Sequence, residues 1–191
     1  MKKISLGSLF IICLIAFWNC SSPSDKKEAQ QSDSTAITIE AFINNSNEHC
    51  LIITELFKMS ERSTVDEIRD YIAANAPLNQ TLLEETRTLA KAKGIATGDT
   101  LSARKNRRIS KLAKQSGIEF NTSFVKMLNM EQRRYSSILK KAMTIDDSEV
   151  QKFISQNAPL MKKQTDALRA IRKKVLNNPG AESAKRNEKP A

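Results

Sequence analysis

The chain has 191 residues and a formal net charge of +10, with 27% charged and 40% hydrophobic residues. Without its two polar ends, this length allows a single domain of roughly 140 residues. Five glycines, five prolines and few clusters of β-branched or aromatic residues argue against a β-rich fold.

The first twenty residues have the pattern of a lipoprotein signal peptide. Met1-Lys2-Lys3 is positively charged, residues 4–18 are almost wholly apolar, and Cys20 follows directly. We expect residues 1–19 to be removed and the Cys20 thiol to carry a lipid. The residues before Cys20 match the usual lipobox loosely, which leaves an ordinary signal peptide or an uncleaved anchor as alternatives. The apolar run is shorter than the roughly 20 residues of a bilayer-spanning helix.

The expected anchor implies a compartment. Ser21, rather than an aspartate, follows Cys20, which favours the outer membrane of a bacterial envelope, with the domain facing the periplasm. Several lipid chains anchor a protein stably, whereas one binds marginally. Residues 20–36 are polar and predict a flexible tether, and residues 177–191 predict a disordered tail.

Between tether and tail, apolar residues recur at helical spacing in five segments, over about 38–60, 64–93, 101–116, 122–143 and 147–176. Ser63 is the expected N-cap of the second helix, and Gly94 is its expected stop. Gly117 is expected to end the short third helix. Asp146 is expected to cap the last helix, with Glu149 three residues further on.

An internal repeat organises these helices. Residues 42–87 align with residues 124–169 without a gap, at an offset of 82, and Asn-Ala-Pro-Leu occurs in both copies. Each copy is an amphipathic helical hairpin that cannot bury its apolar face alone. We therefore predict an all-α four-helix bundle over residues 37–176, with the segment 94–121 as the crossover. Pro77 and Pro159 occupy equivalent positions and should kink their helices.

Several packing and turn positions are also found together in a known family. They are Phe42-Ile43, Val65-x-x-Ile68-Arg69-x-Tyr71-Ile72, Leu89-Ala90-Lys91-Ala92-Lys93-Gly94-Ile95, Leu112-x-x-x-x-Gly117-Ile118-Glu119-Phe120 and Phe124-Val125-x-x-Leu128. Over residues 38–176 the chain resembles the bacterial secreted family known as domain of unknown function 4142, which implies a ferritin-like bundle. That family usually carries two Asp-His pairs. Leu78-Asn79 and Glu131-Gln132 stand at the matching positions, so both histidines are missing.

The charge is distributed unevenly. Residues 36–100 hold 6 Lys/Arg against 10 Asp/Glu, whereas residues 101–176 hold 18 against 6. Such asymmetry favours an anionic partner for the second half. For a secreted, tethered protein, anionic lipid, polysaccharide or an acidic protein are better candidates than nucleic acid.

The short basic helix is the predicted contact with that partner. Its candidate residues are Arg104, Arg107, Arg108 and Lys111. The alternative is a helix that packs one face on the bundle and simply exposes its charges to water.

The sequence does not predict an enzyme or a cofactor. Gly-x-Ser-x-Gly, P-loop and Cys-x-x-Cys motifs are absent, and a di-iron site needs two Glu-x-x-His motifs, which are also absent. The single histidine, His49, and Glu131 occupy equivalent repeat positions. With Asn75 and Asn157 they could form a relic metal site or, as we prefer, a hydrogen-bonded layer that fixes helix register.

Cys50 is the one cysteine expected in the mature domain, and its apolar helical stripe predicts a buried, unreactive thiol. The leading interpretation is a membrane-tethered envelope lipoprotein that acts as a non-enzymatic binding or structural module with a basic face. A ferritin-like metal- or redox-linked envelope protein and a periplasmic stress factor are the alternatives.

Overall fold

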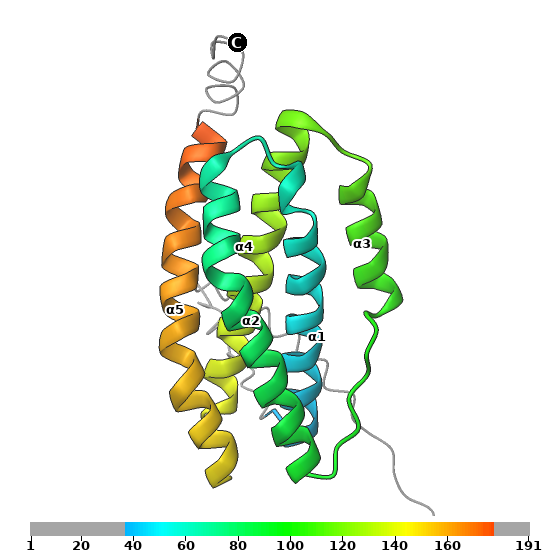
Figure 1. The fold of residues 1–191 in the computed structure, drawn as a ribbon. Helices are drawn as coiled ribbons and strands as arrows, with labels where there is room; N and C mark the ends of the chain where they lie inside the picture. Colours follow the sequence, from blue (N-terminus) through cyan, green and yellow to red (C-terminus); the bar gives the residue numbers. More distant parts are fainter. Residues whose placement is uncertain (1–36, 178–191) are drawn as a thin grey trace, which may run out of the picture. The chain divides into compact units, whose positions relative to one another are not determined.

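A computed structural model of the chain describes residues 37–177. The predicted signal peptide, the tether with Cys20 and the tail beyond Asn177 lie outside the described residues. Four long helices form a bundle: α1 (Ile39–Lys58), α2 (Asp66–Ala92), α4 (Gly117–Ala142) and α5 (Ser148–Asn177). The short α3 (Ala103–Ala113) lies beside them (Figure 1). The predicted all-α class is confirmed, and no helix within residues 37–177 combines the length and apolar character needed to cross a bilayer.

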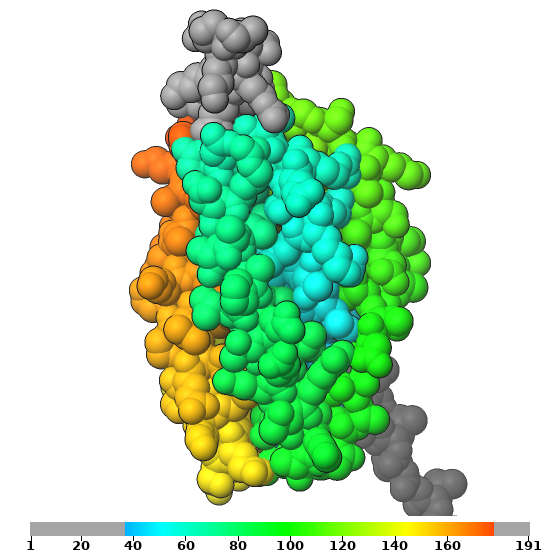
Figure 2. Space-filling model, in the orientation of Figure 1, coloured from blue at the N-terminus to red at the C-terminus, as the bar shows by residue number. Residues whose placement is uncertain are grey.

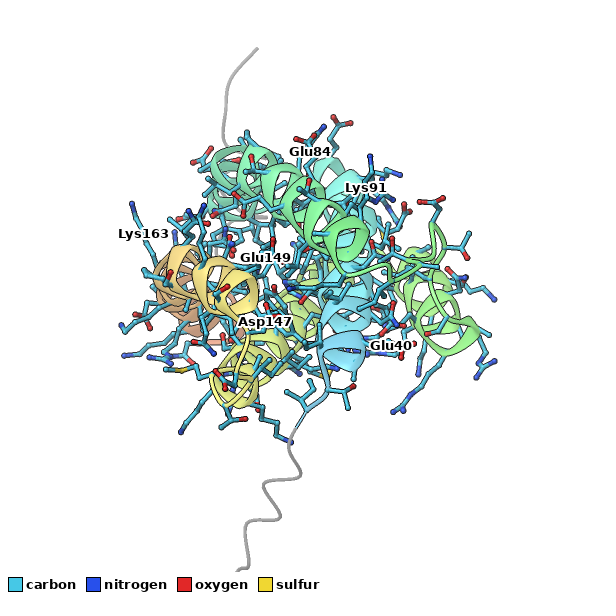
Figure 3. All side chains as sticks on the ribbon, turned by 90° about the horizontal axis from the view of Figure 1, so that it is seen from below. Glu40, Glu84, Lys91, Asp147, Glu149 and Lys163 are labelled. Atoms are coloured by element: carbon cyan, nitrogen blue, oxygen red, sulfur yellow. The ribbon has the colours of Figure 1, made fainter. Side chains whose placement is uncertain are left out.

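The bundle is built from two hairpins, as the repeat predicts. α1 packs on α2 and α4 packs on α5, and the hairpins meet through α1 against α4 and α2 against α5. α2 begins at Asp66 and α5 at Ser148, which reproduces the offset of 82 found in the sequence. In the end-on view of Figure 3, α3 and α5 lie on opposite sides of the bundle.

Two apolar clusters form the core. One contains Ile52, Leu56, Phe120 and Phe124, and the other contains Phe42, Cys50, Tyr135, Leu139 and Phe153. The Phe42 and Phe153 rings meet edge to face, with centroids 5.7 Å apart, and join the two hairpins. Each hairpin therefore covers the apolar face of the other.

The start of α2 differs from the prediction. The helix begins at Asp66 after an extended Val65, so Ser63 is not its N-cap. Instead the Ser63 hydroxyl accepts a hydrogen bond from the Val65 N–H (3.1 Å) and donates one to Asn121 Oδ1 (3.0 Å). Ser63 thereby ties the α1–α2 turn to α4, a contact between residues far apart in sequence.

The boundary between α3 and α4 also differs. α4 begins at Gly117 instead of residue 122, so Gly117 opens this helix and does not end the preceding one. Gly117 has a φ of 54°, in the left-handed region that glycine tolerates, and the chain turns there directly into α4. Phe120 is fully buried and packs near Phe124, at 5.4 Å between centroids, which holds this first turn on the core.

Gly94 ends α2 as predicted. Its φ is 66°, and the Ile95 N–H donates to the Ala90 carbonyl (2.9 Å) while the Gly94 N–H donates to the Lys91 carbonyl (3.2 Å). This pair of hydrogen bonds defines a Schellman motif, which satisfies carbonyls at the helix end.

Both prolines lie inside continuous helices. Two residues before each, the repeated asparagine donates to a carbonyl of its own helix: Asn75 to Tyr71 (2.6 Å) and Asn157 to Phe153 (3.0 Å). Figure 1 shows α2 changing direction near its middle. The two hairpins therefore treat their prolines in the same way.

At the start of α5, Asp147 is the cap, not Asp146. Its Oδ1 accepts from the N–H groups of Glu149 (3.1 Å) and Val150 (3.0 Å). Its Oδ2 lies 2.7 Å from Lys93 Nζ, which also pairs with Glu149 at 2.6 Å. Figure 3 labels Asp147 and Glu149 at this end of the bundle. The hydrogen bond from the Lys93 ammonium has the largest effect in lowering the pKa of the Asp147 carboxyl, and the hydrogen bond from the Val150 N–H has the next largest.

Substitutions at Asp147 separate its two roles. We expect D147A to destabilise the protein more than D147N, because asparagine keeps the capping acceptor and loses only the charge. The advantage of wild type over D147N should exist above the ordinary pKa of aspartate. It should disappear as pH falls through the lowered pKa of folded Asp147, because the carboxylate then binds a proton. Urea unfolding between pH 7 and pH 2 measures both effects.

The neighbouring Asp146 is exposed and provides the matched control. D146A should unfold at the same urea concentration as wild type. A loss equal to that of D147A would contradict the assignment of the cap.

Candidate functional site

The outer face of α3 carries a stripe of four cations, which we call the α3 stripe: Arg104, Arg107, Lys111 and Lys114. At 3.6 residues per turn their side chains fall within about 80° of the helix circumference. All four are exposed, and within residues 37–177 no hydrogen bond or ion pair engages any of these side chains. α3 itself contains no acidic residue.

The inner face of α3 holds the helix on the bundle. Leu112 is 1% exposed and belongs to the core cluster of Phe120 and Phe124, against which Leu101 and Ile109 also pack. α3 contacts α1 and α4. In Figure 2, side chains fill the space that separates the α3 and α1 ribbons in Figure 1.

A buried carboxylate on α4 fastens the same inner face. Glu131 is 1% exposed, and its two oxygens accept hydrogen bonds from Lys105 Nζ (2.5 Å) and Arg108 Nη1 (2.8 Å). Arg134 lies 3.7 Å from the same carboxylate and reaches Glu48 at 3.5 Å. Lys105 is 7% exposed, and this burial lowers the pKa of its ammonium although Glu131 opposes the effect. These charge-assisted bonds join α3 to the bundle.

The structure therefore divides the four predicted anion-binding residues. Arg104, Arg107 and Lys111 lie on the exposed stripe, but Arg108 lies at its edge and binds Glu131 inside the protein. Lys114 joins the stripe in its place. Lys105 is the inward cation that the sequence analysis missed. Its spacing of four residues from Leu101 and from Ile109 is the signal that could have placed it on the inner face.

His49 lies beside this ionic cluster and is uncharged at neutral pH. It is 2% exposed and stacks on Tyr135, with ring centroids 4.1 Å apart. Burial, and then the positive charges of Lys105 and Arg134, lower the pKa of its imidazole to about 3. Metal binding by His49 and Glu131 would have to displace two cations from the carboxylate. Within the described residues no group of three His, Cys, Asp or Glu side chains could hold a metal ion.

The expected four-residue polar cluster does not assemble. Asn75 and Asn157 bond within their own helices, and Asn157 also donates to Glu85 (2.8 Å). Among residues 37–177 no hydrogen bond joins either amide to His49 or Glu131. Each side-chain amide instead bonds the carbonyl four residues earlier in its own helix, which accounts for the difference.

Amides occupy the two positions where the resembling family carries histidine. Asn79 is 7% exposed and donates to Thr54 Oγ1 (2.9 Å) and the Cys50 carbonyl (3.2 Å). Gln132 is 1% exposed and donates to Gln164 Oε1 (3.3 Å). The interior is thus polar at these points, with neutral side chains paired across helices.

Cys50 is buried, as predicted, and forms no disulfide. Burial raises the pKa of its thiol to about 12, so the reactive thiolate is scarce at neutral pH.

The comparisons with known proteins give one match. The family model described as Domain of unknown function (DUF4142) matches residues 25–171. No curated protein and no solved structure matches the chain.

Removing the charge of Glu131 should be costly. E131Q leaves the Lys105 ammonium buried without a counter-charge, and we expect a loss of about 3–5 kcal/mol in the free energy of unfolding. The double variant K105M/E131L should recover most of that loss, because apolar side chains replace both charges. Urea denaturation measures these differences.

E48Q is the control, because Glu48 is partly exposed and its contact with Arg134 is long. It should cost less than about 1 kcal/mol. An E131Q variant as stable as E48Q would contradict the fastening role of Glu131.

His49 should make stability depend on pH. The unfolded chain binds a proton at His49 below a pH of about 6.5, whereas the folded chain does so only near 3. Stability should therefore fall as pH falls through this window, by about 2 kcal/mol between pH 7 and pH 5. The H49F variant keeps the stacking on Tyr135 but has no imidazole to bind a proton. Its stability should therefore not show this fall between pH 7 and pH 5. Unfolding curves of both proteins across the window test it, and identical pH slopes would contradict the buried neutral state.

Proposed function

The chain belongs to the family described as Domain of unknown function (DUF4142). We propose, from the sequence of its first twenty residues and the exposed face of α3, that it is a membrane-tethered envelope lipoprotein that binds an anionic partner without catalysing a reaction. Cys20 carries the lipid in this proposal. The protein faces the periplasm from the outer membrane, and the α3 stripe is its binding surface.

The unpaired cations of the α3 stripe support this proposal. Elsewhere on the bundle, some exposed cations pair with an acidic neighbour on the same helix, as Lys58 does with Glu55 and Lys162 with Asp166. The α3 stripe has no such neighbour. Its positive charges therefore remain available to an external anion.

The attachment of α3 supports it as well. Here Leu112 and Glu131 hold the helix from below, so the stripe is presented in a fixed orientation. A preformed array of charges loses less conformational entropy on binding than a flexible one.

Anionic lipid headgroups fit this array best. Each Lys or Arg close to an anionic membrane contributes about 1 kcal/mol, and the straight outer side of a helix can approach a flat surface. A lipid anchor would also keep the α3 stripe close to the membrane and so raise its effective concentration there. Weak individual contacts would then be enough to hold the stripe on the membrane surface. Polysaccharide and acidic protein are the other partners that the same charges would attract.

Vesicle co-sedimentation tests the proposal, using the chain from Ile37 onward so that no anchor contributes. We expect binding to vesicles that contain phosphatidylglycerol and none to neutral phosphatidylcholine vesicles. The binding should weaken steeply with salt, because the Debye length falls from about 10 Å at 0.1 M to about 3 Å at 1 M. The variant R104E/R107E/K111E should bind at least about 100-fold more weakly.

K152E/K163E/K173E is the matched control, since it makes the same change in net charge at exposed lysines of α5. It should retain most of the binding. Equal losses in the two variants would show that net charge alone attracts the protein. No binding to either kind of vesicle would contradict the membrane contact.

A further inference from the structure

A second surface feature lies between α4 and α5. It is a groove with a volume of about 440 Å³. Leu139, Ala158 and Met161 line its interior, and Leu139 and Met161 are each only 3% exposed. Met143 also lines the groove and is 62% exposed. A volume of this size and a mostly apolar lining are typical of sites for small molecules.

The rim of the groove is cationic. Lys140, Lys162 and Arg169 line it together with one acidic residue, Asp166. Asp166 pairs with Lys162 (2.6 Å) and with Arg169 (3.4 Å). Lys140 forms no ion pair within the described part of the chain. Two cations therefore share one carboxylate while Lys140 has none, and the rim keeps a positive excess.

The first hairpin provides an internal comparison, because it has the same helices at an offset of 82. Its counterparts of Met143, Met161 and Lys162 are Glu61, Asn79 and Gln80. The rim positions there hold Lys58, Glu61, Glu84 and Arg87, whose charges cancel. Since both hairpins form the same fold, the exposed Met143 and Lys162, which replace Glu61 and Gln80, are not required by the fold.

We propose that this groove binds a single-chain anionic amphiphile, a long-chain carboxylate. The acyl chain lies along Met143 and Ala158, above a floor formed by Leu139 and Met161, and the carboxylate lies at Lys140 and Lys162. The groove favours a single chain over a bilayer surface, because a flat surface does not enter a groove between two helices. α5 and α3 lie on opposite sides of the bundle, so this site is separate from the α3 stripe (Figures 1 and 3).

The proposal predicts that affinity depends on both the acyl chain and the carboxylate of the ligand. Each methylene that leaves water should strengthen binding, by up to about fourfold. The carboxylate should contribute through the two lysines. A neutral amphiphile of equal chain length should therefore bind more weakly than the carboxylate.

Calorimetric titration of the full chain with octanoate, decanoate and dodecanoate, all below their micelle concentrations, tests these expectations. Affinity should rise at each step, and monomeric dodecyl maltoside should bind at least tenfold more weakly than dodecanoate. K140E/K162E should weaken dodecanoate binding at least tenfold. K58E/Q80E, at the equivalent positions of the first hairpin, should change it less than twofold, and so should R104E/R107E/K111E.

Methyl NMR gives a second readout that does not depend on substitutions. Dodecanoate should shift the methyl signals of Met143 and Met161. The methyl signal of Met130 should stay in place, because Met130 lies by α3, where Arg108 Nη2 approaches its sulfur at 3.6 Å.

Three results would overturn the proposal: no binding of dodecanoate, an affinity independent of chain length, or equal binding by wild type and K140E/K162E. If the protein binds anionic vesicles but does not bind dodecanoate, the proposal for the groove is overturned and the proposal for the α3 stripe stands. If the protein binds dodecanoate but does not bind anionic vesicles, the proposed function is overturned and the proposal for the groove stands.

Discussion

An ionised carboxylate inside a helical bundle requires cations beside it, and Glu131 imposes this requirement here. With 1% exposure it cannot reach water for solvation. Lys105 and Arg108, both on α3, meet the need, and Arg134 adds a third positive charge on α4 itself. The position of α3 follows from this demand together with the burial of Leu112. The exposed α3 stripe then follows in turn, because the α3 residues that face neither Glu131 nor the core around Leu112 have to face solvent.

The duplicated hairpin shows how one backbone supports two chemistries. His49 and Glu131 are equivalent in the repeat and lie in the same ionic neighbourhood, yet burial keeps the first neutral while α3 keeps the second paired. Asn79 and Met161 are likewise equivalent, and one forms a hydrogen bond to Thr54 while the other lines the apolar groove. Duplication thus left the packing positions alike and allowed the remaining positions to diverge.

Neutral polar pairs cross the interior between these sites. Gln132 reaches Gln164, and the Tyr135 hydroxyl donates to Ser46 Oγ at 3.3 Å. Such pairs link specific positions on different helices, so a shift in register would leave buried polar atoms unsatisfied. At Asn79 and Gln132, the side chains thus form neutral polar pairs between helices.

The sequence by itself determined the helices, the duplication, the family and the burial of Cys50, because periodicity and glycine stops are local properties of the chain. It placed Gly94 correctly for the same reason. It misplaced Ser63, Gly117 and the cap at Asp147, since each depends on a contact with a distant segment: Asn121 for Ser63, the α1 core residues Ile52 and Leu56 for the first turn of α4, and Lys93 for Asp147. Only the tertiary structure decided that Arg108 faces Glu131, 23 residues away in sequence, while Arg107 faces water. The charge of a side chain can be read from the sequence, but its partner depends on which helices pack together.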